Sequence, residues 1–187
     1  MNELALAAFA AETGTHLVGE PRGRRFAAFV RRFDAAEYME SLARADVRWC
    51  PRTADEFQPL LRSIHDPPPG LFTRGAADVE LLRRPAVAVV GARSCSPYGA
   101  QVARMLGREL GATGLVVVSG LARGVDGEVH RGALDAGGAT VAVLGCGIDR
   151  DYPAAHAELA ARIVGGGGLI VGEYAPGVEP APWRFPA

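Results

Sequence analysis

Short apolar runs alternate with segments of helical periodicity from about residue 85 onward. Runs of β-branched and other apolar residues predict four buried strands, at residues 86–90, 115–118, 140–144 and 169–171. Helical patterns fill the intervals, one opening at Ser96-Pro97 and the others at about 125–136 and 154–164. Apolar strands separated by helices are typical of a mainly parallel sheet covered on both faces. With right-handed crossovers, the pattern predicts an α/β fold with a Rossmann-like, doubly wound sheet.

Local signals fix where two of these elements begin and end. Ser96 is a capping residue and Pro97 suits a first helical turn. In the helix that follows, the predicted buried stripe is Val102, Leu106 and Leu110. Residues 165–168 are all glycine and lie between a helix and a strand, which predicts a helix C-cap and a tight turn.

The first 50 residues carry a different, helical pattern. Apolar side chains recur at i, i+3, i+4 and i+7 in Phe26, Phe29, Val30 and Phe33, while arginines take the other positions at Arg24, Arg25, Arg31 and Arg32. This predicts an amphipathic helix, and we interpret its arginines as a solvated face in preference to a DNA contact.

A chain break separates this segment from the strand-rich part. Pro67-Pro-Pro-Gly70 interrupts the chain, and a short strand-like stretch follows at residues 71–75. We expect a domain junction between residues 50 and 80, with a helical N-terminal segment at 1–50 and a Rossmann-like domain at 51–187.

Composition restricts the classes of function. Net charge is −1, so any binding to a polyanion must be local, and all 20 basic residues are arginine, which excludes Schiff-base chemistry and a Walker lysine. Three widely spaced cysteines, Cys50, Cys95 and Cys146, indicate reduced thiols in a cytoplasmic protein. An acidic N-terminus and the lack of a long apolar segment argue against export and membrane insertion.

Glycine-rich loops follow the predicted strands, where ligands bind in such sheets. They are residues 91–94, 119–124, 145–147 and 172–174, and we expect them to lie side by side along one edge. Two of them carry an arginine, Arg93 and Arg123, which predicts a compact pocket for phosphate. The predicted binding residues are Gly91, Arg93, Ser94, Ser119, Gly120, Arg123 and Gly124, with backbone amides cradling the anion.

Other chemistries are less well supported. Asp126 and His130 lie four residues apart near Ser119, but no GxSxG elbow is present, so we interpret this pair as a structural brace behind the loops and not as a catalytic triad. Four scattered histidines, His16, His65, His130 and His156, do not predict a metal site. Residues 91–94 differ from the GxGxxG of dinucleotide enzymes. Tyrosines near strand ends, Tyr98, Tyr152 and Tyr174, could stack on bases or simply pack.

An ordered set of motifs extends over roughly residues 50–187. The motifs are Gly91-Ala-Arg-x-x-Ser-x-Tyr-Gly99, Ser119-Gly-x-Ala-Arg-Gly-Val-Asp126, His130-Arg-Gly-Ala-Leu134, Gly137-Gly-x-Thr-x-x-Val-Leu-Gly145, Tyr152-Pro153, Glu173-Tyr174 and Phe185-Pro186. Together they resemble the DprA/Smf family of DNA-processing proteins. The resemblance implies a cytoplasmic, Rossmann-like protein that binds and protects single-stranded DNA. It also implies loading of RecA in natural transformation, homodimers, no cofactor and no catalysis.

The chain departs from the family pattern in two places. Gly172 stands where the family usually has serine, and an Arg-Asn-Arg motif with further elements is expected after Phe185-Pro186, whereas this chain stops at Ala187. The resemblance therefore implies a domain that is incomplete at its C-terminus.

Two alternatives remain open. One is an enzyme of a related fold, a nucleoside-monophosphate phosphoribohydrolase, although its Pro-Gly-Gly-x-Gly-Thr-x-x-Glu signature is absent from the sequence. The other is an interaction module that has a folded core without DNA binding.

Overall fold

The computed structural model describes residues 3–14 and 23–185. His16 and Pro186, both considered above, lie outside these ranges. None of the helices in the described ranges has the length and apolar character needed to cross a bilayer.

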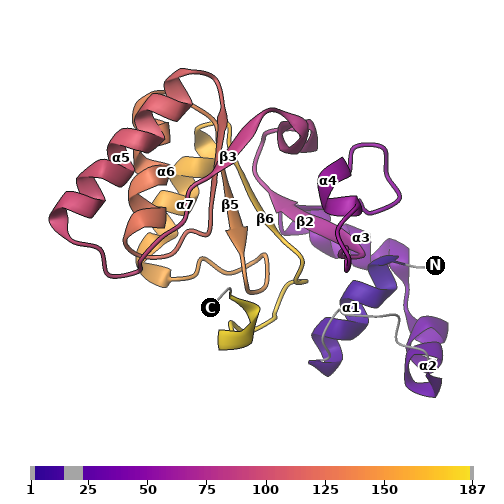
Figure 1. Cartoon of the computed structure of the whole chain (residues 1–187). Helices are drawn as coiled ribbons and strands as arrows, with labels where there is room; N and C mark the ends of the chain where they lie inside the picture. Colours follow the sequence, from indigo (N-terminus) through magenta and orange to yellow (C-terminus); the bar gives the residue numbers. More distant parts are fainter. Residues whose placement is uncertain (1–2, 15–22, 186–187) are drawn as a thin grey trace.

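Six strands form one mixed sheet in the order β1-β2-β6-β5-β4-β3 (Figure 1). Strands β3 to β6 are mutually parallel, and β2 and β1 extend the sheet beyond β6 in antiparallel pairings. Their bounds are β1 Val47–Pro51, β2 Gly70–Arg74, β3 Ala86–Ala88, β4 Val116–Ser119, β5 Thr140–Leu144 and β6 Leu169–Gly172. The expected α/β, Rossmann-like class is confirmed, and the carboxyl ends of the four parallel strands share one edge.

Helices α5 (Pro97–Ala112), α6 (Val125–Asp135) and α7 (Ala157–Gly165) lie together on one side of this sheet (Figure 1). Strands β3, β4, β5 and β6 are neighbours in the sheet in the same order as in the chain. Because crossovers between neighbouring parallel strands share one, right-handed sense, the connecting helices all lie on the same face of the sheet. The sequence predicted helices on both faces of the sheet. The opposite face instead carries one short 3-10 helix, η1 (Val79–Arg83), which packs over β4, β5 and β6. Beyond η1, Val143 of β5 and Val90 after β3 are 45% and 71% exposed.

Helices α5 and α6 touch through glycines. A Cβ on Gly132 would lie 2.0 Å from the Arg104 carbonyl oxygen, and one on Gly107 would lie 2.1 Å from that of Val129. The buried residues of α5 are accordingly Ala103, Gly107 and Gly111. The predicted stripe was wrong at Leu106, which is 42% exposed, because close helix packing favours small residues over leucine at this interface.

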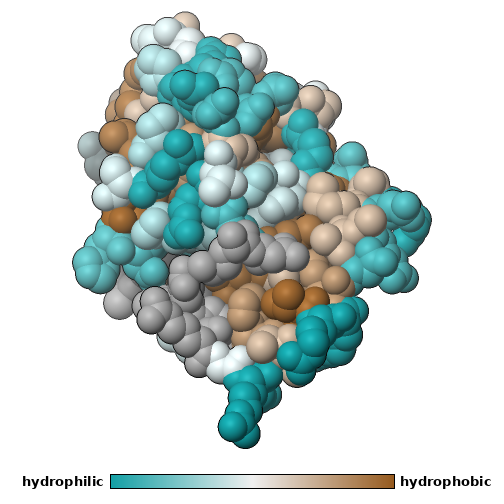
Figure 2. Space-filling model, turned by 90° about the vertical axis from the view of Figure 1, so that its right-hand side faces the viewer, coloured by the Kyte–Doolittle hydropathy of each residue, from teal (hydrophilic) through white to brown (hydrophobic). Residues whose placement is uncertain are grey.

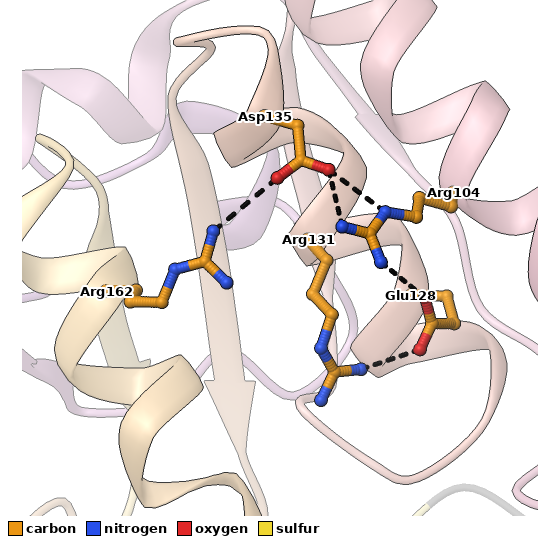
Figure 3. A network of polar contacts seen from close by, with 5 residues as sticks. All are labelled: Arg104, Glu128, Arg131, Asp135 and Arg162. Atoms are coloured by element: carbon orange, nitrogen blue, oxygen red, sulfur yellow. Dashed lines mark hydrogen bonds and ion pairs between the residues drawn. The ribbon is translucent and has the colours of Figure 1, made fainter.

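A network of ion pairs joins the outer surfaces of α5, α6 and α7 (Figure 3). Asp135 of α6 accepts hydrogen bonds of 2.9 and 2.7 Å from Arg104 of α5, and its other oxygen lies 3.5 Å from Arg162 of α7. Glu128 lies 3.6 Å from Arg104 and 2.8 Å from Arg131. Arg104, Arg131 and Arg162 of this surface are therefore all paired with carboxylates.

Of the N-terminal helices, α1 (Glu3–Thr13) and α3 (Ala35–Arg44) pack beside the strands β1 and β2, whereas α2 (Arg24–Arg32) packs on α1 (Figure 1). Helix α1 is buried from residue 3 to residue 10, since Leu4 and Ala7 join the core of the sheet while Phe9 joins a cluster with α2. The boundary expected at residue 50 falls within β1. Short helices complete the fold: α4 Pro59–Arg62, η2 Ala154–His156 and η3 Pro182–Arg184.

Candidate functional site

A cleft of about 850 Å³ opens at the carboxyl ends of the parallel strands. The loops after β3, β4 and β5 and the last described segment form its walls. The lining residues are Arg93, Ser94, Gly120, Ala122, Arg123, Arg150, Asp151, Tyr152, Pro153, Ala154, Ala155, Glu179, Pro180 and Phe185. The two predicted arginine loops thus border one cleft.

The loops after β3 and β4 are tied together behind the cleft. The buried Asp126 carboxylate accepts hydrogen bonds from the Gly91 and Gly120 amides, at 3.4 and 3.1 Å. The Val125 amide donates to the Ala92 carbonyl at 3.2 Å. Gly124 adopts φ +74°, and a Cβ there would lie 2.2 Å from the same carbonyl oxygen. These bonds hold the two arginine loops in a fixed relation.

The backbone amides of Gly91 and Gly120, which were expected to bind an anion, have another partner in the structure. The amides of Gly91 and Gly120 already donate to Asp126, because a carboxylate is a strong acceptor next to the positive end of α6. Within residues 3–14 and 23–185, no hydrogen bond engages the amides of Arg93, Ser94 or Arg123. Backbone donors without a partner are therefore found at these three residues and not at Gly91 and Gly120.

Arginines and carboxylates both line the cleft, but the carboxylates are paired. Arg150 donates to Glu179 at 2.6 Å, and Asp151 pairs with Arg74 behind the wall. No carboxylate in the described part of the chain pairs with Arg93 or Arg123, and both residues are exposed. The Arg93 guanidinium lies 5.3 Å from the centre of the Phe185 ring. The local charge is positive although the whole chain is not.

The predicted binding residues fall into two groups. Arg93, Ser94, Gly120 and Arg123 line the cleft, whereas Gly91, Ser119 and Gly124 are not among its lining residues. Ser119 is 2% exposed, and its hydroxyl donates to the Val89 carbonyl at 2.7 Å. The Ser119 hydroxyl is thus already bonded within the fold, whereas a direct ligand contact at Gly91 or Gly124 stays a prediction.

Sequence reasoning missed Arg150 and Asp151 of the cleft wall. The sequence shows an arginine shortly after the glycines at 145 and 147, which could have indicated a third charged loop. The direction of a charged side chain in a long loop is, however, decided only when the loop folds. The tyrosines also separate in the structure. Tyr152 lines the cleft 5.7 Å from the Phe185 ring, Tyr98 is 76% exposed outside the lining, and Tyr174 packs beneath Arg184.

The groups of the hypothetical triad do not form one. Ser119 bonds a backbone carbonyl, Asp126 bonds two loop amides, and the His130 Nδ1 lies 2.7 Å from the Thr140 hydroxyl. Each polar group is therefore committed to holding the fold. In the described ranges, no three His, Cys, Asp or Glu side chains are grouped closely enough to hold a metal ion.

Burial sets the protonation of His130. The Thr140 hydroxyl donates to the Val117 carbonyl, so it accepts from His130, which places the histidine proton on Nδ1. The buried Nε2 has no partner in the described residues. Burial, with smaller contributions from His156 and Arg131, lowers the pKa of His130 to about 3.

We therefore expect His130 to make the folded protein less stable as the pH is lowered. An unfolded histidine has a pKa of about 6.5, so acid favours the unfolded state from that pH down to the folded value of about 3. At pH 5 the expected loss is about 2 kcal/mol relative to pH 7.5. Urea unfolding of the wild type and His130→Gln at both pH values measures it; an equal pH dependence in the two proteins would rule out this source.

Comparison with known proteins identifies the family to which the chain belongs. The model of the DNA recombination-mediator protein A family matches residues 49–187, which is most of the chain and includes all the cleft residues. The chain belongs to this family.

Curated family members are similar in sequence over the same region. The chain is 44% identical over 127 residues to DNA processing protein DprA of Streptococcus pneumoniae, which covers 68% of this chain and 44% of that protein. It is 38% identical over 136 residues to protein Smf of Escherichia coli, covering 73% of this chain and 36% of that protein. The chain thus spans less than half the length of these relatives.

Solved family structures share the fold. DNA processing protein A of Streptococcus pneumoniae superposes with a TM-score of 0.72 at 31% identity, covering 97% of this chain and 65% of that one. The protein from Helicobacter pylori, whose structure describes a unique single-stranded DNA binding mode, gives a TM-score of 0.64 at 30% identity. That match covers 75% of this chain and 62% of the other. The likeness to the first includes the N-terminal helices.

Proposed function

We propose that this chain binds single-stranded DNA in the cleft at the carboxyl ends of β3, β4 and β5. The observation that carries the proposal is the pair of exposed arginines, Arg93 and Arg123, on adjacent loops with no carboxylate partner among the described residues. The single-stranded DNA binding mode of the Helicobacter pylori relative supports the same ligand.

Each part of the cleft has a distinct role in this proposal. Arg93 and Arg123 neutralise phosphates with charged, multidentate donors, and the Ser94 amide adds a neutral one. Tyr152, which is 41% exposed, offers a ring face to bases, which are accessible in a single strand but stacked inside a duplex. Contacts of this kind recognise backbone and base faces, so we expect little sequence preference.

We propose that the cleft acts by binding alone, without catalysis or a cofactor. Supporting this, the hydroxyl, imidazole and carboxylate that could form a nucleophilic site are bonded elsewhere. Release of free base from a nucleotide by the purified protein would contradict it.

Protection of the bound strand, RecA loading in transformation or recombination, and homodimer formation are also proposed. Membership of the DNA recombination-mediator protein A family supports this role. Pull-down of RecA on a coated strand, and the mass of the protein in solution, test the two partners separately.

The binding itself is tested by fluorescence anisotropy with a labelled oligo-dT at several salt concentrations. Two neutralised phosphates predict a slope of about −1.4 in log K against log salt, at about −0.7 for each phosphate on a single strand. A matched duplex is expected to bind more weakly. A protein that melts cooperatively but binds no single strand, or binds duplex equally well, would contradict the proposal.

A further inference from the structure

Helix α2 concentrates positive charge away from the cleft. Four of its nine residues are arginine, and the helix contains no acidic residue. The arginines form two pairs, Arg24 with Arg25 and Arg31 with Arg32, and the exposed residues Ala27 and Ala28 lie between the pairs. In Figure 2, strongly hydrophilic side chains project at the lower end of the molecule, where α1 and α2 lie in Figure 1.

The apolar side of α2 is already occupied. Phe29 is buried, and the ring of Phe9 in α1 lies 5.3 Å from that of Phe26 and 5.4 Å from that of Phe29. Phe33 stacks on Phe29 at 5.2 Å. A basic amphipathic helix that binds a membrane needs its apolar face free. Here the phenylalanines are packed within the protein, and the exposed surface of α2 consists mainly of its arginines, with Val30 38% exposed.

Three of the four arginines lack an anionic partner in the described ranges. Arg32 pairs with Glu12 and lies over the Phe29 ring, whereas Arg24, Arg25 and Arg31 make no ion pair there. Three other exposed arginines have carboxylate neighbours: Arg44 with Glu40 at 3.7 Å, Arg83 with Glu80 at 3.3 Å and Arg108 with Glu109 at 3.1 Å. Three more, Arg48, Arg62 and Arg84, donate to backbone carbonyl oxygens instead. The uncompensated charge on α2 therefore favours binding of an external anion.

The spacing of these charges indicates an extended anion. Arg24 and Arg31 are seven residues apart, which is two helical turns or about 10.5 Å along the axis. Between the two arginine pairs, the small side chains of Ala27 and Ala28 leave room for a ligand to lie close to the helix. A small anion would meet one pair only, whereas a chain of phosphates can lie across the alanines and meet both.

Helix α1 separates this face from the cleft. Ala7, Ala10 and Ala11 of α1 lie against Tyr174, Val178 and Arg184, which belong to the segment that leads to the cleft wall. Helix α2 packs on α1 through the Phe9 and Phe26 rings, so α1 is a neighbour both of α2 and of that segment. One helix has a diameter of roughly 10 Å, and a strand that leaves the cleft toward α2 has to pass α1.

We infer that the arginine face of α2 is a second contact for the phosphates of a single strand that extends out of the cleft. The inference rests on the proposed function. It replaces the interpretation of these arginines as a merely solvated face, because their missing partners and occupied apolar side appear only in the folded structure.

Variants of α2 and of the cleft, measured on short and long strands, test the inference. The α2 variant is Arg24→Ser with Arg25→Ser and Arg31→Ser, and the ligands are oligo-dT of about 8 and about 40 nucleotides, since single-strand sites span roughly 4–16 nucleotides. We expect about tenfold weaker binding of the long strand, a salt slope shallower by about 2, and little change on the short strand. Thermal melting checks that the variant is folded.

A control with the same change in net charge replaces Arg44, Arg83 and Arg108 by serine. Wild-type affinity of the α2 variant for the long strand, or an equal loss in the control, would overturn the inference. The cleft variant Arg93→Ala with Arg123→Ala separates it from the proposed function. Loss on both strands in the cleft variant, with loss on the long strand alone in the α2 variant, supports the proposed function and the inference together. Normal binding of both strands by the cleft variant would refute the cleft as the DNA site, and with it the inference of a second contact for a strand leaving the cleft, whatever the α2 variant does.

Discussion

Replacing both Arg93 and Arg123 by alanine is expected to weaken binding of a short oligo-dT about a hundredfold. Each guanidinium is exposed on a loop that Asp126 and Gly124 hold in place, so truncation removes a charged donor without disturbing the loop. A hydrogen bond to a charged group contributes about 1.5–3 kcal/mol, and two of them correspond to at least two powers of ten. Anisotropy titrations at one salt concentration measure the ratio.

Two companion variants make this result specific. Arg93→Lys with Arg123→Lys keeps the charge and is expected to recover part of the affinity, because lysine lacks the planar fork of donors. Arg83→Ala with Arg108→Ala removes the same charge from paired surface positions and should change affinity little. A cleft variant that binds as well as wild type would remove these arginines from the site.

Gly132→Ala is expected to destabilise the protein by about 3 kcal/mol or more. The added Cβ would lie 2.0 Å from the Arg104 carbonyl oxygen, well inside any contact that atoms tolerate. The obstacle is backbone of α5, which cannot rotate away as a side chain would, so the two helices must separate. Overpacking of a rigid core typically costs 1–3 kcal/mol and occasionally more. Urea unfolding followed by circular dichroism measures the loss.

Gly165→Ala is the matched control within another helix. Gly165 ends α7, and a Cβ there would meet nothing within 4 Å. We expect unchanged or slightly higher stability, by about 0.5–1 kcal/mol, since alanine lowers the entropy of the unfolded chain. Equal stability of the Gly132→Ala and Gly165→Ala proteins would mean that α5 and α6 do not pack as described.

The strands were predictable because their apolar runs are local. The structure places β5 at the predicted residues 140–144. β4 is shifted by one residue, β6 ends one residue later than predicted, and β3 ends two residues earlier. The face of α5 was not predictable in the same way. Periodicity ranks Leu106 above Gly107, but the partner helix approaches so closely that the smaller residue is the buried one.

The candidate site shows the same division. Arg93 and Arg123 follow neighbouring strands, so the rule that ligands bind at the carboxyl edge of a parallel sheet brought them together. The role of Asp126 toward the Gly91 and Gly120 amides required three-dimensional distances. The sequence does not indicate whether the amide of a glycine that follows a strand is free to bind a ligand or is already hydrogen-bonded within the protein.

By itself, the sequence determined the α/β class, the parallel strands, the arginine loops and the family resemblance, because each depends on residues close together in the chain. Tertiary structure decided which loop residues face the cleft, that Arg150 and Phe185 join its walls, and that three arginines of α2 are left without carboxylates in the described chain. These properties depend on which side chains meet across the fold, and burial and charge pairing are settled only when the elements pack.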